Sequence, residues 1–140
     1  MDARRDALEI ARRAIQAVLP ERAVREALSE KSFSERLALG GRLVLVAVGK
    51  AAWRMASAAS EALGDRLDRG VVVTKYGHSS GSIGGLEIFE AGHPLPDENG
   101  VRGAARALEM ASGLSKSDTV LFLVSGGGSA LFEKPADGLS

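Results

Sequence analysis

The sequence predicts an α/β fold with a mainly parallel sheet, and two observations carry this prediction. Apolar, β-branched runs alternate along the chain with segments of helical periodicity, which is typical of strands joined by crossover helices. Two of the runs, at 43–48 and 119–124, are apolar apart from one threonine, as in strands that helices cover on both faces. The expected architecture is a Rossmann-like three-layer α/β/α arrangement, incomplete within this chain.

The composition excludes several classes of protein. The 140 residues are 45% hydrophobic and 26% charged, which is ordinary for a single globular domain. With 18 basic and 18 acidic residues the net charge is zero, so nothing indicates a nucleic-acid partner. The longest apolar stretch is far shorter than the roughly 20 residues that span a bilayer, and the charged start is no secretory signal. The lack of cysteine fits a reducing compartment, so we expect a cytoplasmic protein without a membrane partner.

Two helices are predicted before any strand. Between Ala3 and Leu19 the apolar residues recur at the spacing of an amphipathic helix, opposite a face of arginines. Pro20 ends this helix, and Glu21–Glu30 restarts as a second, shorter one. We expect both helices to pack on the flank of the sheet, and we expect Ser32–Gly41 to be a polar connection.

Four strands and two further helices follow. The predicted strands are Arg42–Val48, Gly70–Thr74, Leu86–Ala91 and Thr119–Val124. The predicted helices are Lys50–Leu63 and Asp97–Ser112. Alanines along one face of the first of these helices allow a close approach to the sheet, and Gly64 is placed to cap its end. The alternating pattern of the third strand indicates a position nearer an edge of the sheet.

The loops after the strands are the candidate ligand-binding segments, because ligands of open parallel sheets bind beyond the carboxyl ends of the strands. The strongest signal is the run Ser125, Gly126, Gly127, Gly128, Ser129, directly after the fourth strand. Glycines with positive φ can direct several backbone N–H groups into one concavity, and the serine hydroxyls add donors. This glycine loop is a candidate phosphate cradle. The alternative is a flexible turn that binds no ligand.

Other polar residues follow the remaining strands. Lys50 comes directly after the first strand, where a cation in the first turn of a helix opposes the helix dipole unless an anion is bound in front of it. His93, between a glycine and a proline, could act as acid, base or donor near a reacting hydroxyl, or could order its loop. Lys75 and His78 could contact an anion, or could belong to a mobile surface loop.

Several nucleotide and metal motifs are absent. The chain has no GxxxxGK[ST] motif, which excludes a P-loop enzyme. The first strand is followed by Gly49-Lys-Ala-Ala and not by the GxGxxG fingerprint of dinucleotide-binding domains. Neither histidine has a metal-ligand partner at helical spacing, so no metal ligand is expected in this chain.

Four segments in order, Val48–Ala52, Gly70–Lys75, Glu90–Asp97 and Leu123–Leu131, carry a family resemblance. They are similar to the amino-terminal part of glycerate 2-kinases of the MOFRL-associated type, which are often labelled hydroxypyruvate reductases. The resemblance implies transfer of the γ-phosphoryl group of ATP to the 2-hydroxyl of D-glycerate, with Mg²⁺. Chains of that family are longer and have a second α/β domain. We therefore expect residues 1–140 to be the N-terminal portion of the N-terminal domain, with little activity alone.

The resemblance also implies roles for the loop residues. Lys50 would be the catalytic residue, neutralising charge on the transferring phosphoryl group or the substrate. The glycine loop would bind phosphate or nucleotide, and His93 and Lys75 would bind the substrate. Two alternatives remain open: an NAD(P)H-dependent hydroxypyruvate reductase, and a non-catalytic module that binds a phosphosugar or another anion. A homo-oligomer is possible for the kinase and for both alternatives.

Overall fold

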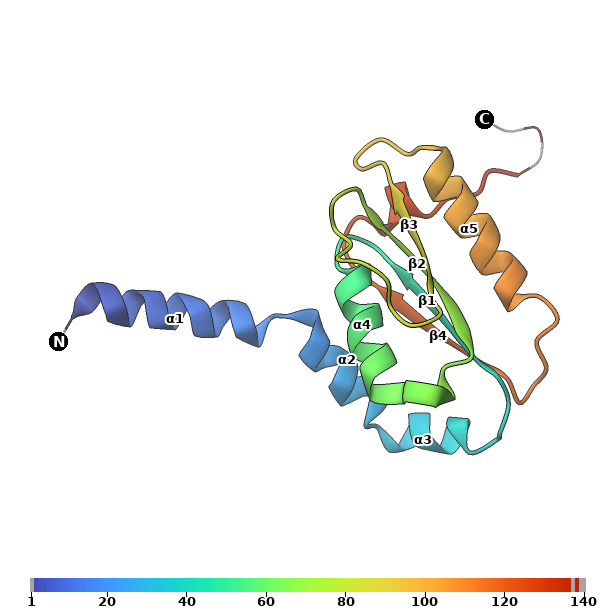
Figure 1. The fold of residues 1–140 in the computed structure, drawn as a ribbon, viewed down its shortest axis with the longest axis horizontal. Coiled ribbons are helices and arrows are strands. Elements are labelled where there is room, and N and C mark those ends of the chain that lie inside the picture. The colour runs from blue at the N-terminus through green and yellow to red at the C-terminus, as the bar shows by residue number, and fades with distance from the viewer. Residues whose placement is uncertain (1, 137, 139–140) are drawn as a thin grey trace.

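A four-stranded sheet forms the centre of the computed structural model, which describes residues 2–136 and 138 (Figure 1). The strands are β1 (Leu43–Val48), β2 (Arg69–Lys75), β3 (Glu87–Ala91) and β4 (Thr119–Val124). The helices are α1 (Ala3–Ala17), α2 (Pro20–Leu28), α3 (Lys31–Leu37), α4 (Ala52–Leu63), α5 (Glu98–Ala111) and α6 (Gly128–Leu131), with a 3₁₀ turn at Gly64–Arg66. The strand order is β3-β2-β1-β4 and every pair is parallel. The α/β prediction is confirmed, and β3 lies at an edge as expected.

Helices cover both faces of the sheet, so the core has two halves. On one face, Leu45 and Ala47 of β1 pack with α4, and α2 lies against α4 through the buried Val24. On the other face, Val44, Val46 and Val48 of β1 pack with α5 and with Leu131 of α6. Alternate residues of β1 therefore enter opposite halves of the core, and every residue of the strand is buried.

A small residue allows a helix to lie close to the sheet. Gly103 of α5 faces β2, and a Cβ atom there would stand 2.6 Å from a methyl group of Val73.

The predicted helix caps are also present. Gly64 ends α4 with a positive φ of 52°, and the Asp97 carboxylate accepts a hydrogen bond from the backbone N–H of Gly100 at the start of α5.

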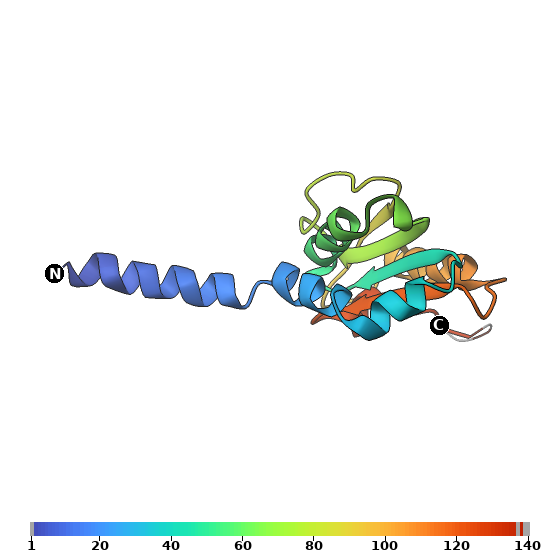
Figure 2. The same cartoon turned by 90° about the horizontal axis from the view of Figure 1, so that it is seen from below.

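The expectation for α1 is wrong. No residue of α1 is buried, and the helix extends away from the sheet in both views (Figure 2). Only α2 packs as expected. The apolar side chains of Leu8 and Ile15 are 50% and 61% exposed, so amphipathic spacing identified a face but not a partner for it.

Two further expectations need correction. The segment predicted as a polar connection contains the helix α3, in which Phe33 and Leu37 stand one turn apart and are half-buried. The strand β4 is covered on one face only. Val120, Phe122 and Val124 are exposed, because β4 forms the second edge of the sheet and α5 lies over β2 and β3.

Candidate functional site

The candidate site lies between β1 and β4, where the connections diverge to opposite faces of the sheet. The loop after β1 leads to α4 on one face, and the loop after β4 leads to α6 on the other. Parallel sheets bind ligands at such a point, in the crevice between the two diverging loops. Lys50 and the glycine loop occupy these two positions, as the sequence predicted.

Hydrogen bonds tie the two loops together. The backbone N–H of Lys50 donates to the carbonyl oxygen of Gly126 at 2.9 Å. The hydroxyl of Ser125 donates to the carbonyl of Val48 at 3.2 Å and accepts from the N–H of Ala51 at 3.0 Å. The Ser125 hydroxyl proton is therefore engaged within the protein. The Ser125 side chain therefore joins the two loops, and the groups that can donate to a ligand here are backbone N–H groups.

His93 brings the third loop into the same place. A Cβ atom at Gly127 would stand 2.8 Å from Nε2 of His93 and 3.4 Å from Cε of Lys50. Gly127 has a φ of +88°, a conformation that residues with a side chain rarely adopt. The ring of His93, the stem of Lys50 and the bare backbone of Gly127 thus meet at one point.

The backbone around Gly127 can receive an anion. Within residues 2–136 and 138, no acceptor of the chain takes the N–H groups of Gly126 or Gly127. Free amides beside the exposed ammonium of Lys50 offer hydrogen bonds and positive charge together. The following helix α6 has only four residues, so its dipole adds little, and the donors available to an anion here are the backbone amides and the lysine.

The loop after β2 reaches Lys50 through His78. Nδ1 of His78 lies 3.0 Å from the carbonyl oxygen of Lys50. A carbonyl can only accept, so Nδ1 is the donor in this contact. Both histidines of the chain therefore contact the Lys50–Gly127 region, one from each of two loops. The signal in the sequence was that both follow strands in a chain with only two histidines.

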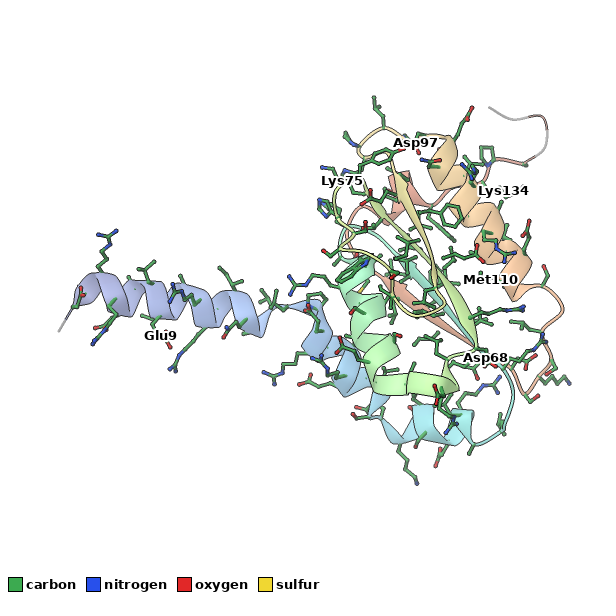
Figure 3. All side chains as sticks on the ribbon, in the orientation of Figure 1. Glu9, Asp68, Lys75, Asp97, Met110 and Lys134 are labelled. Atoms are coloured by element: carbon green, nitrogen blue, oxygen red, sulfur yellow. The ribbon has the colours of Figure 1, made fainter. Side chains whose placement is uncertain are left out.

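Lys75 ends β2 at the same rim. It lies opposite Ala91 in the register with β3, and strand alternation places it on the sheet face that carries Val71 and Val73. Figure 3 shows Lys75 and Asp97 at one end of the sheet and Asp68 at the other. Lys75 thus lies at the predicted rim, while the contacts at Gly127 come from Lys50 and His93.

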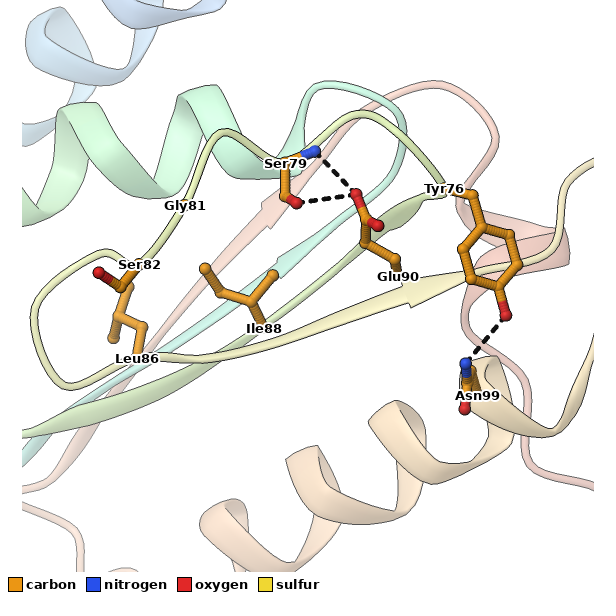
Figure 4. Close-up of a pocket in the computed structure, with 8 residues that line it drawn as sticks. All are labelled: Tyr76, Ser79, Gly81, Ser82, Leu86, Ile88, Glu90 and Asn99. Atoms are coloured by element: carbon orange, nitrogen blue, oxygen red, sulfur yellow. Dashed lines mark hydrogen bonds between the residues drawn. The ribbon is translucent and has the colours of Figure 1, made fainter.

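Glu90 orders the loop that holds His78. Its carboxylate accepts a hydrogen bond from the backbone N–H of Gly77. It accepts two more from Ser79, one from the backbone N–H and one from the hydroxyl (Figure 4). These bonds, the Ser79 hydroxyl first, hold the pKa of Glu90 below its usual range. The carboxylate faces a shallow groove of about 570 Å³ beside β3, which also contains Tyr76 and Asn99. Glu90 therefore acts on the site through the loop.

Comparison with known proteins identifies the family. The model of a family described as a domain of unknown function, DUF4147, matches residues 6–140. The chain belongs to the DUF4147 family. This match covers β1 to β4 and all four loops of the rim.

Relatives of this DUF4147 chain carry two kinds of name. A D-glycerate 2-kinase of Thermotoga maritima is 55% identical over 96% of the chain, which spans 30% of that relative. A glycerate 2-kinase of Pyrococcus horikoshii is 39% identical over the whole chain, which spans 32% of it. A relative from Agrobacterium vitis carries a hydroxypyruvate-reductase label and is 44% identical over 68% of the chain and 22% of its own length. The expected family and both of its labels are confirmed.

A solved structure supports the same relationship. The crystal structure of the glycerate kinase of Thermotoga maritima superposes with a TM-score of 0.83, over 96% of this chain and 31% of that one. The DUF4147 chain thus shares its fold with that kinase and spans about 30% of the length of these relatives.

The acidic residues near the rim of the DUF4147 chain are held by hydrogen bonds within the chain. Across the described residues, no three carboxylates or histidines gather where they could hold a metal ion. The carboxylates of this rim are engaged: Glu90 with its loop, and Asp97 with the Tyr76 hydroxyl at 2.7 Å. The same part of the chain contains no helix long and apolar enough to cross a bilayer.

Proposed function

We propose that this chain forms part of the active site of an ATP-dependent glycerate 2-kinase. In the reaction, the 2-hydroxyl oxygen of D-glycerate forms a bond to the γ-phosphorus of ATP. The bond from that phosphorus to the bridging oxygen breaks, ADP leaves, and the hydroxyl proton is released. The observation that carries the proposal is 55% identity, over 96% of the chain, to a protein named D-glycerate 2-kinase.

Lys50 is the residue to which we assign catalysis. Phosphoryl transfer passes through a loose transition state, so the protein contributes position and positive charge more than a strong base. Lys50 is exposed, and its backbone is fixed at both of its polar groups. Its carbonyl oxygen contacts Nδ1 of His78, and its N–H donates to the carbonyl of Gly126. Both contacts fix the backbone and leave the ammonium free to meet the transferring phosphoryl group.

The glycine loop is the proposed binding site for phosphate oxygens. We assign the donors to the backbone amides of Gly126, Gly127 and Gly128 and to Ser129, and we assign to Ser125 the task of joining this loop to β1. His93 and Lys75 are the proposed substrate-binding side chains, because His93 stands on the loop after β3 and Lys75 ends β2 at the same rim. Magnesium would arrive with ATP, and no residue of this chain is assigned to it.

The proposal extends to the organisation of the protein. Relatives with the kinase name are matched over only 30% and 32% of their length, so other segments supply most of those proteins. We propose that residues 1–140 are the N-terminal portion of the N-terminal α/β domain. On this proposal, the 140 residues alone transfer little or no phosphate.

A paired assay tests the reaction. The gene product that contains this sequence, at its natural length, is offered D-glycerate with MgATP and, separately, hydroxypyruvate with NADH or NADPH. We expect 2-phosphoglycerate from the first pair only. Lys50→Ala should lower its formation at least about 100-fold, whereas the control Lys31→Ala, on the far surface of α3, should leave it unchanged.

Each other outcome contradicts the proposal in a different way. Oxidation of NADH or NADPH without kinase activity would support the hydroxypyruvate reductase. Phosphate binding without turnover of either pair would support the anion-binding module. If Lys50→Ala still forms 2-phosphoglycerate at an undiminished rate, the protein is a kinase but Lys50 is not its catalytic residue.

A further inference from the structure

Thr74 of β2 is a polar residue with no exposed surface, directly after three buried valines. Its hydroxyl donates a hydrogen bond to the carbonyl oxygen of Gly49, at 3.1 Å, in the turn that follows β1. Valine has almost the same shape as threonine and needs no hydrogen-bond partner in a core. The hydroxyl is therefore the feature that distinguishes Thr74 from its neighbours, and it acts on the residue directly before Lys50.

The peptide group between Gly49 and Lys50 is held at both ends. Its carbonyl oxygen, which belongs to Gly49, accepts from the Thr74 hydroxyl. Its N–H, which belongs to Lys50, donates to the carbonyl oxygen of Gly126 at 2.9 Å. Because a peptide group is planar, two bonds at its opposite ends fix the orientation of the whole plane. The Cα atom of Lys50 lies in that plane.

The next peptide group, between Lys50 and Ala51, is held in the same way. Its carbonyl oxygen lies 3.0 Å from Nδ1 of His78, and its N–H donates to the Ser125 hydroxyl at 3.0 Å. The two planes share the Cα atom of Lys50, so together they set the direction in which its side chain leaves the backbone. The four residues that hold the two planes, here called the Lys50 frame, are Thr74, His78, Ser125 and Gly126.

The Lys50 frame joins β1 to both of its neighbours in the sheet. Two members reach the turn from β2 and the loop after it, and the other two reach it from the loop after β4. Thr74 is the only fully buried member of the frame. No water molecule can therefore take the place of its hydroxyl at the Gly49 oxygen, whereas water can replace a contact at an exposed residue.

We propose that Thr74 is a positioning residue, which fixes the direction of Lys50 through the carbonyl oxygen of Gly49. The hydroxyl touches no ligand and holds the plane from which the Lys50 side chain extends. Its effect on the reaction rests on the proposed kinase function, whereas the geometry of the turn does not depend on that function. Misplacement of a reacting group by about 1 Å costs up to about 100-fold in rate, so the orientation of this turn matters for phosphoryl transfer.

Two substitutions separate positioning from packing, because they change stability and geometry in opposite ways. Thr74→Val removes the hydroxyl and keeps the shape, and the Gly49 oxygen keeps its bond from the N–H of Ala52, at 3.0 Å. In the natural-length gene product we expect its melting temperature to stay within about 2 °C. Thr74→Ser keeps the hydroxyl and removes a buried methyl group, so its melting temperature should fall by about 2–4 °C.

The activities of the same proteins should run against their stabilities. With D-glycerate and MgATP, Thr74→Val should lower kcat at least about 10-fold and leave KM nearly unchanged, because Lys50 is assigned to the transition state. Thr74→Ser should keep at least about half of the kcat. Thr119→Val is the matched control, the same substitution at the only other threonine, which begins β4 at the opposite end of the sheet. It should change neither constant.

Hydrogen exchange measures the turn without the reaction. The amide of Lys50 should exchange at least about 10-fold faster in Thr74→Val than in Thr74→Ser, although Thr74→Ser is the less stable protein. Equal exchange rates overturn the proposal. If the unsubstituted protein forms no 2-phosphoglycerate, the proposed function fails, and these exchange rates alone decide whether Thr74 holds the turn.

The kinetic outcomes are equally decisive. Activity that falls with stability, so that Thr74→Ser is the less active variant, would assign Thr74 to packing and overturn the proposal. An unchanged kcat in Thr74→Val would overturn it as well. A Thr74→Val protein that does not fold would show that the core needs the hydroxyl for stability, which also contradicts a positioning role.

Discussion

The ring of His93 lies against the backbone of Gly127, so close that any side chain at residue 127 would collide with it. An added Cβ atom would stand 2.8 Å from Nε2 and 2.9 Å from Cδ2 of the ring. Because His93 follows β3 and Gly127 follows β4, this contact joins the two edge strands of the sheet across its carboxyl rim.

Gly127→Ala should both destabilise the protein and impair the site. The substitution strains a residue with a φ of +88° and pushes against His93, so we expect a loss of about 2–4 kcal/mol in the free energy of unfolding. Gly113→Ala is the matched control, because Gly113 also has a positive φ, 65°, but open space around its Cβ position. It should cost only about 1–2 kcal/mol. Denaturant unfolding of both variants decides, and equal losses would refute the contact.

Glu90→Gln should loosen the loop that holds His78 against Lys50. The substitution removes the charge that strengthens three hydrogen bonds from Gly77 and Ser79. The only tryptophan, Trp53, donates its indole N–H to the carbonyl of Gly81 in the same loop, at 2.8 Å, and so reports on it. We expect a shift in tryptophan emission and faster amide exchange over 77–82. Glu98→Gln, on the exposed first turn of α5, should change neither signal.

Asp118 should contribute stability that depends on pH. Its carboxylate accepts from the Arg42 guanidinium at 2.8 Å, and from the backbone N–H groups of Ser115 and Arg42. These bonds, the guanidinium first, hold the pKa of Asp118 far below its usual range. A lowered pKa in the folded state stabilises the protein above the unfolded pKa of about 4, and this gain disappears as the pH falls further.

The comparison with Asp118→Asn isolates that contribution. The variant should unfold more easily than the natural chain at pH 7, and the difference should shrink as the pH falls from 4 toward 2. Unfolding free energies measured across this range at constant ionic strength provide the check. A difference that stays constant with pH would mean that the carboxylate charge contributes nothing.

Deletion of residues 2–17 should leave the stability of the sheet unchanged. No residue of α1 is buried, so the deletion removes no part of the core. We expect a melting temperature within about 2 °C of the intact chain. Val24→Ala, in the neighbouring helix α2, should instead cost about 1–3 kcal/mol, because Val24 is 5% exposed and packs with α4. A large effect of the deletion would show that α1 has a partner.

The positions of most elements could be predicted because their signals are local. The β-branched run of β1, the alanines of α4 and the cap at Asp97 each depend on neighbours a few residues away. The resemblance of four short segments to glycerate 2-kinases is also a property of the sequence, and the family match confirms it. The placement of Lys50 and the glycine loop on one rim followed from the rule for parallel sheets alone.

The tertiary structure decided which faces are covered and which loops meet. Amphipathic spacing in α1 and an apolar run in β4 show that a face favours burial, but the partner comes from distant parts of the chain. For α1 no partner lies among the described residues, and for β4 one face is open. The meeting of His93, Lys50 and Gly127 depends in the same way on the strand order β3-β2-β1-β4, which no local pattern encodes. Local sequence sets what each segment prefers, and only long-range packing sets what it touches.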